Sequence, residues 1–231
     1  MGILHTTPPK IAHTLRALAW LLRYPSAELR STAPALIQAL RDEAALRPER
    51  LAELDALADK LRAGGLRTEA EYVELFDRGR RTALHLFEHV HGDSRDRGPA
   101  MVDLAQTYER AGLQFAPGEL PDYLPVVLEF ASTQPATQAR EFLRETAHIV
   151  RSIFSALLDS RSPYASVLAA VLDLAGERAE AVPLAAEPAL DESWEEPAAF
   201  GGCGSAGQSR PNDPQPVHFV RSAPPSQRAS A

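Results

Sequence analysis

The chain has 231 residues, of which 24 are Lys or Arg and 31 are Asp or Glu, so its formal net charge is −7. Apolar residues make up 45% and charged residues 24% of the sequence, which is the balance of a soluble globular protein. The acidic balance argues against a nucleic-acid partner. The single cysteine, Cys203, excludes an internal disulfide. No apolar run is long enough for stable membrane insertion.

The apolar residues before residue 180 recur at the spacing of an α-helix, and no strand-pairing signal appears. Proline and glycine divide this pattern into separate segments. We expect eight helices, over about residues 11–24, 29–46, 48–64, 68–90, 99–112, 122–130, 135–157 and 163–174, the second of them broken before Pro34. This order predicts an all-α fold, a single bundle-like domain of about eight helices with a disordered C-terminal tail.

Two of these helices begin with residues that commonly cap a helix. Thr68 and Glu71 have the spacing of a capping box, which predicts the start of the long helix over 68–90. Asp122 precedes the helix over 122–130 and can cap it. We expect loops at 91–98 and 114–121, between the helices that flank them.

The composition changes near residue 180, and residues 180–231 hold eight of the 19 prolines. We therefore expect a helical domain at 1–180 and a Pro/Gly-rich, acidic, disordered tail at 181–231. Trp194 lies among acidic residues of this tail, either as a short docking segment or as an incidental residue of a solvated stretch. The N-terminus lacks the apolar stretch of a signal peptide, so the expected location is the cytoplasm.

His85, Glu88 and His89 form an H-x-x-E-H pattern, which on one helix face is typical of a zinc hydrolase. On the predicted helix over 68–90, however, both histidines lie opposite the apolar face, beside Arg78 and Arg81. Two guanidinium groups beside a dication oppose its binding, so we expect a solvated polar face and no metal. We also expect no catalytic residue, because Cys203 lies in the tail, where no base is held beside it.

Two segments have the character of a binding surface. Tyr72, Leu75 and Phe76 form an aromatic-rich stripe at helical spacing, which is either a peptide-binding surface or a plain core stripe. Asp122 and Glu129 lie two helical turns apart among apolar residues, where carboxylates can recognise an apolar, Arg-bearing peptide. The alternatives are a simple N-cap for Asp122 and an exposed position for Glu129. The helices over 68–90 and 122–130 are thus the expected walls of a groove.

Three blocks of the sequence, at 72–76, 85–98 and 119–130, resemble the NarJ-type assembly chaperones of respiratory nitrate reductase. These chaperones belong to the wider TorD/DmsD group of redox-enzyme maturation proteins. The resemblance covers about residues 10–200 and is densest at 68–131, and the tail segment 194–197 also looks like this subgroup.

This resemblance implies an all-helical, non-enzymatic chaperone without a cofactor of its own. Its expected client is the N-terminal segment of the catalytic alpha subunit, held in the cytoplasm for molybdenum-cofactor and iron–sulfur insertion before membrane attachment. Tyr72, Leu75 and Phe76 match a Y-x-x-L-F block, and Asp122 matches the acidic residue of the wider group's P-D-H block. Tyr123 stands where that block has His. The alternative function is a zinc-dependent hydrolase that uses the H-x-x-E-H pattern.

Overall fold

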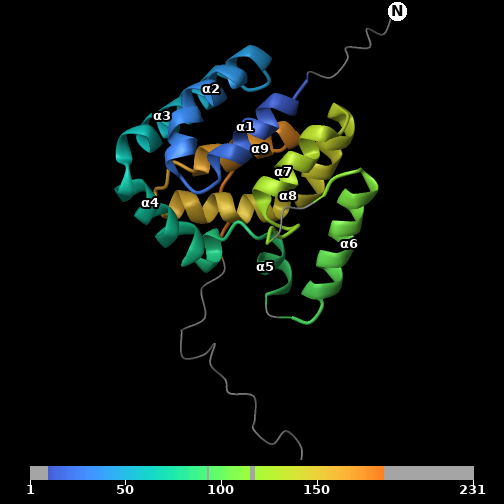
Figure 1. The fold of residues 1–231 in the computed structure, drawn as a ribbon. Coiled ribbons are helices and arrows are strands. Elements are labelled where there is room, and N and C mark those ends of the chain that lie inside the picture. Colours follow the sequence, from blue (N-terminus) through green and yellow to red (C-terminus); the bar gives the residue numbers. More distant parts are fainter. Residues whose placement is uncertain (1–9, 93, 115–117, 185–231) are drawn as a thin grey trace, which may run out of the picture. The chain divides into compact units, whose positions relative to one another are not determined.

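The computed structural model describes residues 10–92, 94–114 and 118–184. In this part of the chain the all-α prediction is confirmed, and Figure 1 shows its helices in order. The α-helices are α1 (Ala12–Leu21), α2 (Ala27–Glu43), α3 (Pro48–Gly64), α4 (Leu66–Tyr72), α5 (Leu86–His91), α6 (Arg97–Arg110), α7 (Leu124–Thr133), α8 (Ala136–Asp159) and α9 (Ala165–Ala175). A π-helix, η1 (Val73–Asp77), and a short 3-10 helix, η2 (Arg80–Thr82), lie between α4 and α5.

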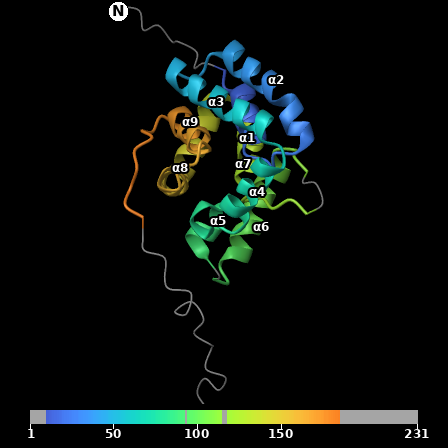
Figure 2. The same ribbon diagram turned by 90° about the vertical axis from the view of Figure 1, so that its left-hand side faces the viewer.

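Helix α9 lies at the centre of the core, and every one of its residues except Asp173 is buried. It packs most extensively against α8, while α1 packs against α7 and α2 packs against both α1 and α3 (Figures 1 and 2). Each fully buried Leu or Val stabilises such a core by about 1.5–3 kcal/mol. Asp173 reaches the rim, where its carboxylate accepts a hydrogen bond of 2.9 Å from Arg50 of α3.

Helix α2 is continuous through Pro34, so the predicted break before this residue is wrong. Proline removes one backbone hydrogen bond, but Pro34 lies on the exposed side, where water can satisfy the carbonyl that loses its partner. The buried side of the helix carries Leu29, Ala33, Ile37 and Leu40 on both sides of the proline. The packing of these buried side chains against the core outweighs the free-energy cost of a proline inside the helix.

The single helix predicted over 68–90 is also wrong, because the chain leaves helical geometry at Gly79. Gly79 has an extended backbone (φ −85°, ψ 99°). A Cβ atom at this position would collide with the carbonyl oxygen of Leu75 and the hydroxyl of Thr82. The Thr82 hydroxyl donates to that same carbonyl oxygen, which ends the π-helix. The segment is therefore divided among α4, η1, η2 and α5.

The predicted capping box is wrong as well. Helix α4 begins at Leu66, and its N-cap residue is Gly65. The Thr68 hydroxyl donates back to the Gly65 carbonyl oxygen at 2.8 Å, and Glu71 pairs with Lys60 at 2.8 Å. Gly65 has a positive φ of 53°, which favours glycine, so α3 and α4 are separated by a single residue.

None of the helices described here is both long and apolar enough to cross a membrane. The described chain continues past the predicted boundary at residue 180, and the Val182 amide donates to the Ser155 hydroxyl at 3.0 Å. Trp194 and Cys203 lie outside the described residues. The division into 1–180 and 181–231 stays a prediction.

Candidate functional site

A hollow of about 510 Å³ lies between the segment that follows α1, the π-helix η1 and the start of α7. Its aromatic lining consists of Tyr24, Tyr72, Phe76 and Tyr123, and we call it the tyrosine pocket. The other side chains and backbone that line it belong to Asp77, Gly79, Arg80, Ala83, Leu84, His85 and Glu88.

The inner wall of the tyrosine pocket is a pair of neighbouring phenols, the buried Tyr72 and the half-buried Tyr123. The Tyr72 hydroxyl donates to the Leu22 carbonyl oxygen at 2.8 Å and lies 3.3 Å from the Tyr123 hydroxyl. Burial raises the pKa of both Tyr72 and Tyr123 above the usual value, so both hydroxyls stay protonated near neutral pH. They therefore present neutral hydrogen-bonding groups beside aromatic faces.

The π-helix brings two different side chains to this wall. The Phe76 ring lies 4.7 Å from the Tyr72 ring and meets Tyr164 edge-on at 5.0 Å, so it is held from behind. Asp77 follows at the open side of the pocket. Within the described residues its carboxylate forms neither a hydrogen bond nor an ion pair. A π-helix turn often marks a functional site, and here it places an apolar ring next to an unpaired carboxylate.

The outer rim of the tyrosine pocket is built around Tyr24, whose side chain is 44% exposed. Its ring meets Tyr72 edge-on at 5.6 Å, and its hydroxyl donates to Glu69 at 2.9 Å. This hydrogen bond raises the pKa of Tyr24. Arg30 in turn pairs with Glu69 at 2.5 Å, so the rim phenol is held in place by α2 and α4.

Asp122 does not lie at the rim of a groove, and it does not cap α7. Its side chain is fully buried, and the N-cap residue of α7 is Tyr123. One carboxylate oxygen accepts from the Phe87 amide at 3.1 Å, and the other lies 3.3 Å from His85 Nδ1. Asp122 thus caps α5, a helix distant in sequence. The expected role of Asp122 is client recognition, with an N-cap of the helix over 122–130 as the alternative, and the structure places it instead at the start of α5.

A short antiparallel bridge fixes this arrangement. The Leu86 amide donates to the Asp122 carbonyl oxygen at 3.0 Å, and the Leu124 amide donates to the Leu84 carbonyl oxygen at 2.8 Å. The rings of His85 and Tyr123 stack at 5.2 Å as a result. The bridge therefore forms one side of the tyrosine pocket.

His85 and His89 do not share a helix face, contrary to the prediction. His85 has an extended backbone and precedes α5, whereas His89 lies in the last turn of that helix. His89 Nε2 lies 2.8 Å from the Ala83 carbonyl oxygen, and Glu88 pairs with Arg97 at 3.3 Å. The described residues contain no group of three or more side chains placed to hold a metal ion.

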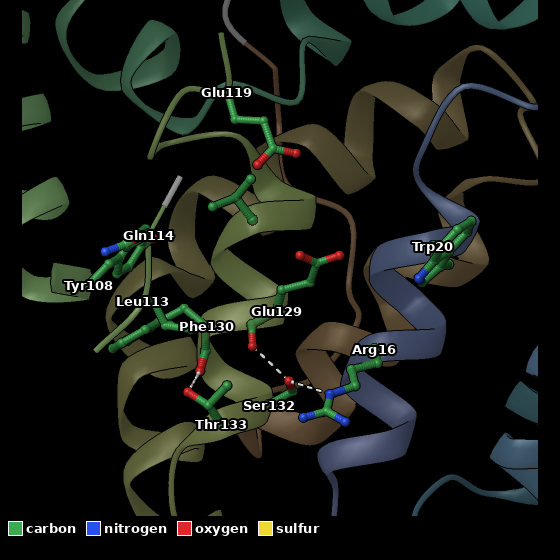
Figure 3. Close-up of a pocket in the computed structure, with 11 residues that line it drawn as sticks. Arg16, Trp20, Tyr108, Leu113, Gln114, Glu119, Glu129, Phe130, Ser132 and Thr133 are labelled. Atoms are coloured by element: carbon green, nitrogen blue, oxygen red, sulfur yellow. Dashed lines mark hydrogen bonds between the residues drawn. The ribbon is translucent and has the colours of Figure 1, made fainter. Parts of the chain in front are cut away.

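A second hollow, of about 260 Å³, lies over α7 between α1 and the chain that follows α6. Figure 3 shows Trp20 and Arg16 on one side of it, and Tyr108, Leu113 and Gln114 on the other. We call it the Trp20 pocket. Its lining is Arg16, Trp20, Tyr108, Leu113, Gln114, Glu119, Val126, Glu129, Phe130, Ser132 and Thr133.

Glu129 belongs to the Trp20 pocket and not to the tyrosine pocket. Its carboxylate pairs with Arg23 at 2.8 Å, and Glu119 lies 3.7 Å from the same guanidinium nitrogen. Burial raises the pKa of Glu129, an effect that Arg23 opposes and Glu119 reinforces. The Arg23 guanidinium also lies 5.4 Å from the centre of the Trp20 ring, a cation–π distance.

The structure therefore brings three of the six predicted site residues together. Tyr72, Phe76 and Tyr123 line the tyrosine pocket, while Leu75 packs partly buried against the main core. Sequence reasoning missed Tyr24 and Asp77, which line the same pocket. Tyr24 directly precedes Pro25 at a helix end, and Asp77 directly follows the Y-x-x-L-F block, so both carried a positional signal.

The chain is similar to known proteins over most of its length. A family profile described as "Nitrate reductase delta subunit" matches residues 26–170. From Escherichia coli (strain K12), a probable nitrate reductase molybdenum cofactor assembly chaperone, NarW, is 40% identical over 195 residues, which are 79% of this chain and 80% of that protein. The nitrate reductase molybdenum cofactor assembly chaperone NarJ of the same organism is 39% identical over 201 residues, covering 80% of this chain and 85% of NarJ.

One further relative and one solved structure are similar to the chain at lower identity. A probable nitrate reductase molybdenum cofactor assembly chaperone, NarJ, from Bacillus subtilis (strain 168) is 33% identical over 172 residues, 73% of this chain and 90% of that protein. Among solved structures, a putative redox enzyme maturation protein from Archaeoglobus fulgidus aligns with a TM-score of 0.48 and 19% identity, over 77% of this chain and 96% of that one.

Proposed function

This chain belongs to the nitrate reductase delta-subunit family, the NarJ-type assembly chaperones, and on that premise we propose that it matures a respiratory nitrate reductase by binding its catalytic alpha subunit. The observation that carries the proposal is the similarity to two proteins named as nitrate reductase molybdenum cofactor assembly chaperones, over about four-fifths of all three chains. The chaperone acts in the cytoplasm and performs no reaction of its own.

The bound part of the client is its N-terminal segment, and it binds in the tyrosine pocket. Aromatic side chains in a partly enclosed pocket supply large contact areas at low entropic cost, so they commonly anchor a peptide. Tyr24, Tyr72 and Tyr123 offer such faces, and the Tyr24 and Tyr123 hydroxyl oxygens can still accept hydrogen bonds from amides of the peptide backbone. This composition favours an apolar segment over a purely charged one.

Asp77 gives the pocket a charge preference. Its carboxylate has no partner among the described residues, and it lines the same pocket as Tyr24, Tyr72 and Tyr123. A guanidinium or ammonium group of the client would pair with this carboxylate while it lies over the tyrosine rings. An apolar segment that carries a cation therefore fits the pocket best.

Binding at this pocket supports assembly without chemistry. A segment held by the chaperone is withheld from the membrane-attached partners of the client, while the rest of the catalytic subunit accepts molybdenum cofactor and iron–sulfur clusters. The chaperone releases the segment once the completed catalytic subunit offers that segment contacts that compete with those of the pocket.

The proposal is tested by affinity capture with the tagged full-length chain in nitrate-grown cells, with the captured proteins identified by mass spectrometry. We expect the catalytic subunit to be captured by the unaltered chain and lost from the Tyr24→Ala, Asp77→Asn double variant. Both positions are exposed enough for the fold to tolerate the changes. Leu66→Ala, at an 82% exposed position outside both pockets, is the matched control. Absence of the catalytic subunit from the unaltered sample would contradict the proposal.

A further inference from the structure

The Trp20 pocket is an apolar hollow that the proposed function leaves unused. Its walls are the Trp20 ring on α1 and the Leu113 side chain beyond α6, and its floor is the Val126 and Phe130 face of α7 (Figure 3). Tyr108 supports the floor, because its ring stacks on Phe130 at 4.5 Å and its hydroxyl donates to the Pro121 carbonyl oxygen at 3.0 Å. The volume of about 260 Å³ has room for one or two bulky side chains.

Most of the charges around the Trp20 pocket are already paired. Arg23 pairs with Glu129 at 2.8 Å and lies 3.7 Å from Glu119, and Arg16 donates to the Ser132 hydroxyl at 3.1 Å. Arg23 and the two glutamates are therefore committed to one another, whereas Arg16 is bonded to a neutral hydroxyl. A charged group seated on the apolar floor of Val126 and Phe130 would lose its hydration, whereas an uncharged apolar group would not. The apolar floor therefore favours an uncharged occupant.

The Trp20 pocket adjoins the tyrosine pocket. On one side, Trp20 lines the first and Tyr24 the second, with Arg23 between them. On the other side, Tyr123 lines the tyrosine pocket and Val126 the Trp20 pocket. Trp20 lies in the last turn of α1, and Tyr24 follows three residues after that helix ends. Tyr123 is the N-cap residue of α7, and Val126 lies in its first turn. Because only three or four residues of chain separate the two linings on each side, one ligand segment can reach both pockets.

We propose that the Trp20 pocket is a second client subsite, which takes an uncharged, bulky aliphatic or aromatic side chain from the same segment that occupies the tyrosine pocket. This inference rests on the proposed function and adds a requirement to it. The client must present a cation-bearing part to the tyrosine pocket and an uncharged apolar residue to the neighbouring pocket. Recognition by two adjacent pockets gives the chaperone more selectivity than either one alone.

Trp20 itself reports on occupancy of this pocket. The chain has two tryptophans, and Trp194→Phe leaves Trp20 as the single indole. The probe is a synthetic peptide of the client's N-terminal segment, titrated into the full-length Trp194→Phe chain. We expect the Trp20 emission to shift to the blue and its quenching by acrylamide to fall, because a bound apolar side chain removes water from the indole.

Two lining positions test the subsite without removing its floor. Leu113→Asp adds an uncompensated carboxylate to a half-buried wall position, and we expect it to weaken peptide binding about tenfold through lost apolar burial. Thr133→Arg adds a charge at an exposed lining position that leaves Tyr108 and Phe130 in place, and we expect the same direction of change. Leu66→Asp, outside both pockets, is the matched control.

The outcomes separate the inference from the function it rests on. Peptide binding that shifts Trp20 emission and is weakened by Leu113→Asp and Thr133→Arg supports the second subsite. Peptide binding with unchanged Trp20 emission and unchanged affinity in both variants overturns the second subsite and leaves the proposed function intact. A peptide that does not bind the unaltered chain overturns both.

Discussion

At the scale of single residues, Asp122 shows how a carboxylate can shape a binding site without lying in it. Its side chain is fully buried and accepts a hydrogen bond from the Phe87 amide of α5. It also lies against His85, whose ring stacks on Tyr123 at the wall of the tyrosine pocket. Asp122 is therefore a positioning residue, and its substitution acts first on folding.

Asp122→Asn should destabilise the fold. The amide has one oxygen in place of two and carries no charge, so its oxygen can accept from the Phe87 amide or from the His85 ring but not from both in the native arrangement. A buried hydrogen-bonding group left unsatisfied costs about 1–3 kcal/mol, and we expect a loss of that size in the free energy of unfolding, measured by urea denaturation. Asp77→Asn is the matched control at an exposed carboxylate. Equal stability of the two variants would contradict the positioning role.

Glu129 should give stability a specific pH dependence. Burial holds its pKa above the ordinary 4.5, so the native state binds this proton more tightly than the unfolded state does. Its contribution to stability is therefore present at low pH and lost as pH rises through 4.5 and the raised native value. Glu129→Gln removes this titration.

The measurement is urea unfolding of both proteins across a series of pH values. We expect the stability of the unaltered chain relative to Glu129→Gln to fall as pH rises above about 4.5. A difference that stays constant, or rises with pH, would show that Arg23 compensates fully for the burial of Glu129.

At the scale of elements, the segment from α4 to α5 decides the shape of the site. In one continuous helix over 68–90, Phe76 and His85 would both project from the same straight element and could not form two different walls. The break at Gly79 instead turns the chain back, so that the π-helix forms one wall of the tyrosine pocket and His85 another. The site depends on this interruption.

Gly79→Ala should disrupt the turn. The added methyl group collides with the Leu75 carbonyl oxygen, which is backbone and cannot move aside cheaply. Overpacking of this kind typically costs about 1–3 kcal/mol, and we expect such a loss in thermal or urea unfolding, together with weaker client binding. Gly98→Ala is the matched control, because a Cβ at Gly98 meets nothing within 4 Å. A Gly79→Ala chain as stable as the control would contradict the account of this turn.

The sequence allowed the helical class to be predicted, together with three of the residues that line the tyrosine pocket. Periodicity identified most helices, and the Y-x-x-L-F block identified Tyr72 and Phe76. Tyr24 and Trp20 were missed because their roles arise from contacts with chain far away in sequence, which local spacing does not encode. The π-helix was missed for a similar reason: its end depends on a hydrogen bond from the Thr82 hydroxyl.

At the scale of the whole molecule, we expect residues 1–180 to form a packed helical domain and the acidic Pro/Gly-rich residues 181–231 to lack packing. The predicted boundary lies at residue 180, and the described helices end with α9 at Ala175. We expect limited proteolysis to trim the chain to a stable fragment of about 20 kDa, because proteases cut unpacked segments first. Mass spectrometry of the fragment identifies its ends. Equal protease resistance of residues 181–231 would contradict this division.

The central claim is that the tyrosine pocket binds the N-terminal segment of the nitrate reductase catalytic subunit. Calorimetric titration of the full-length chain with a synthetic peptide of that segment tests it most directly. We expect saturable binding that Tyr24→Ala weakens by about 30-fold, the equivalent of about 2 kcal/mol for one aromatic anchor. Val102→Ala, at an exposed position of α6 that lines neither pocket, should bind like the unaltered chain. No binding by the unaltered chain, or equal affinity in Tyr24→Ala, would contradict the claim.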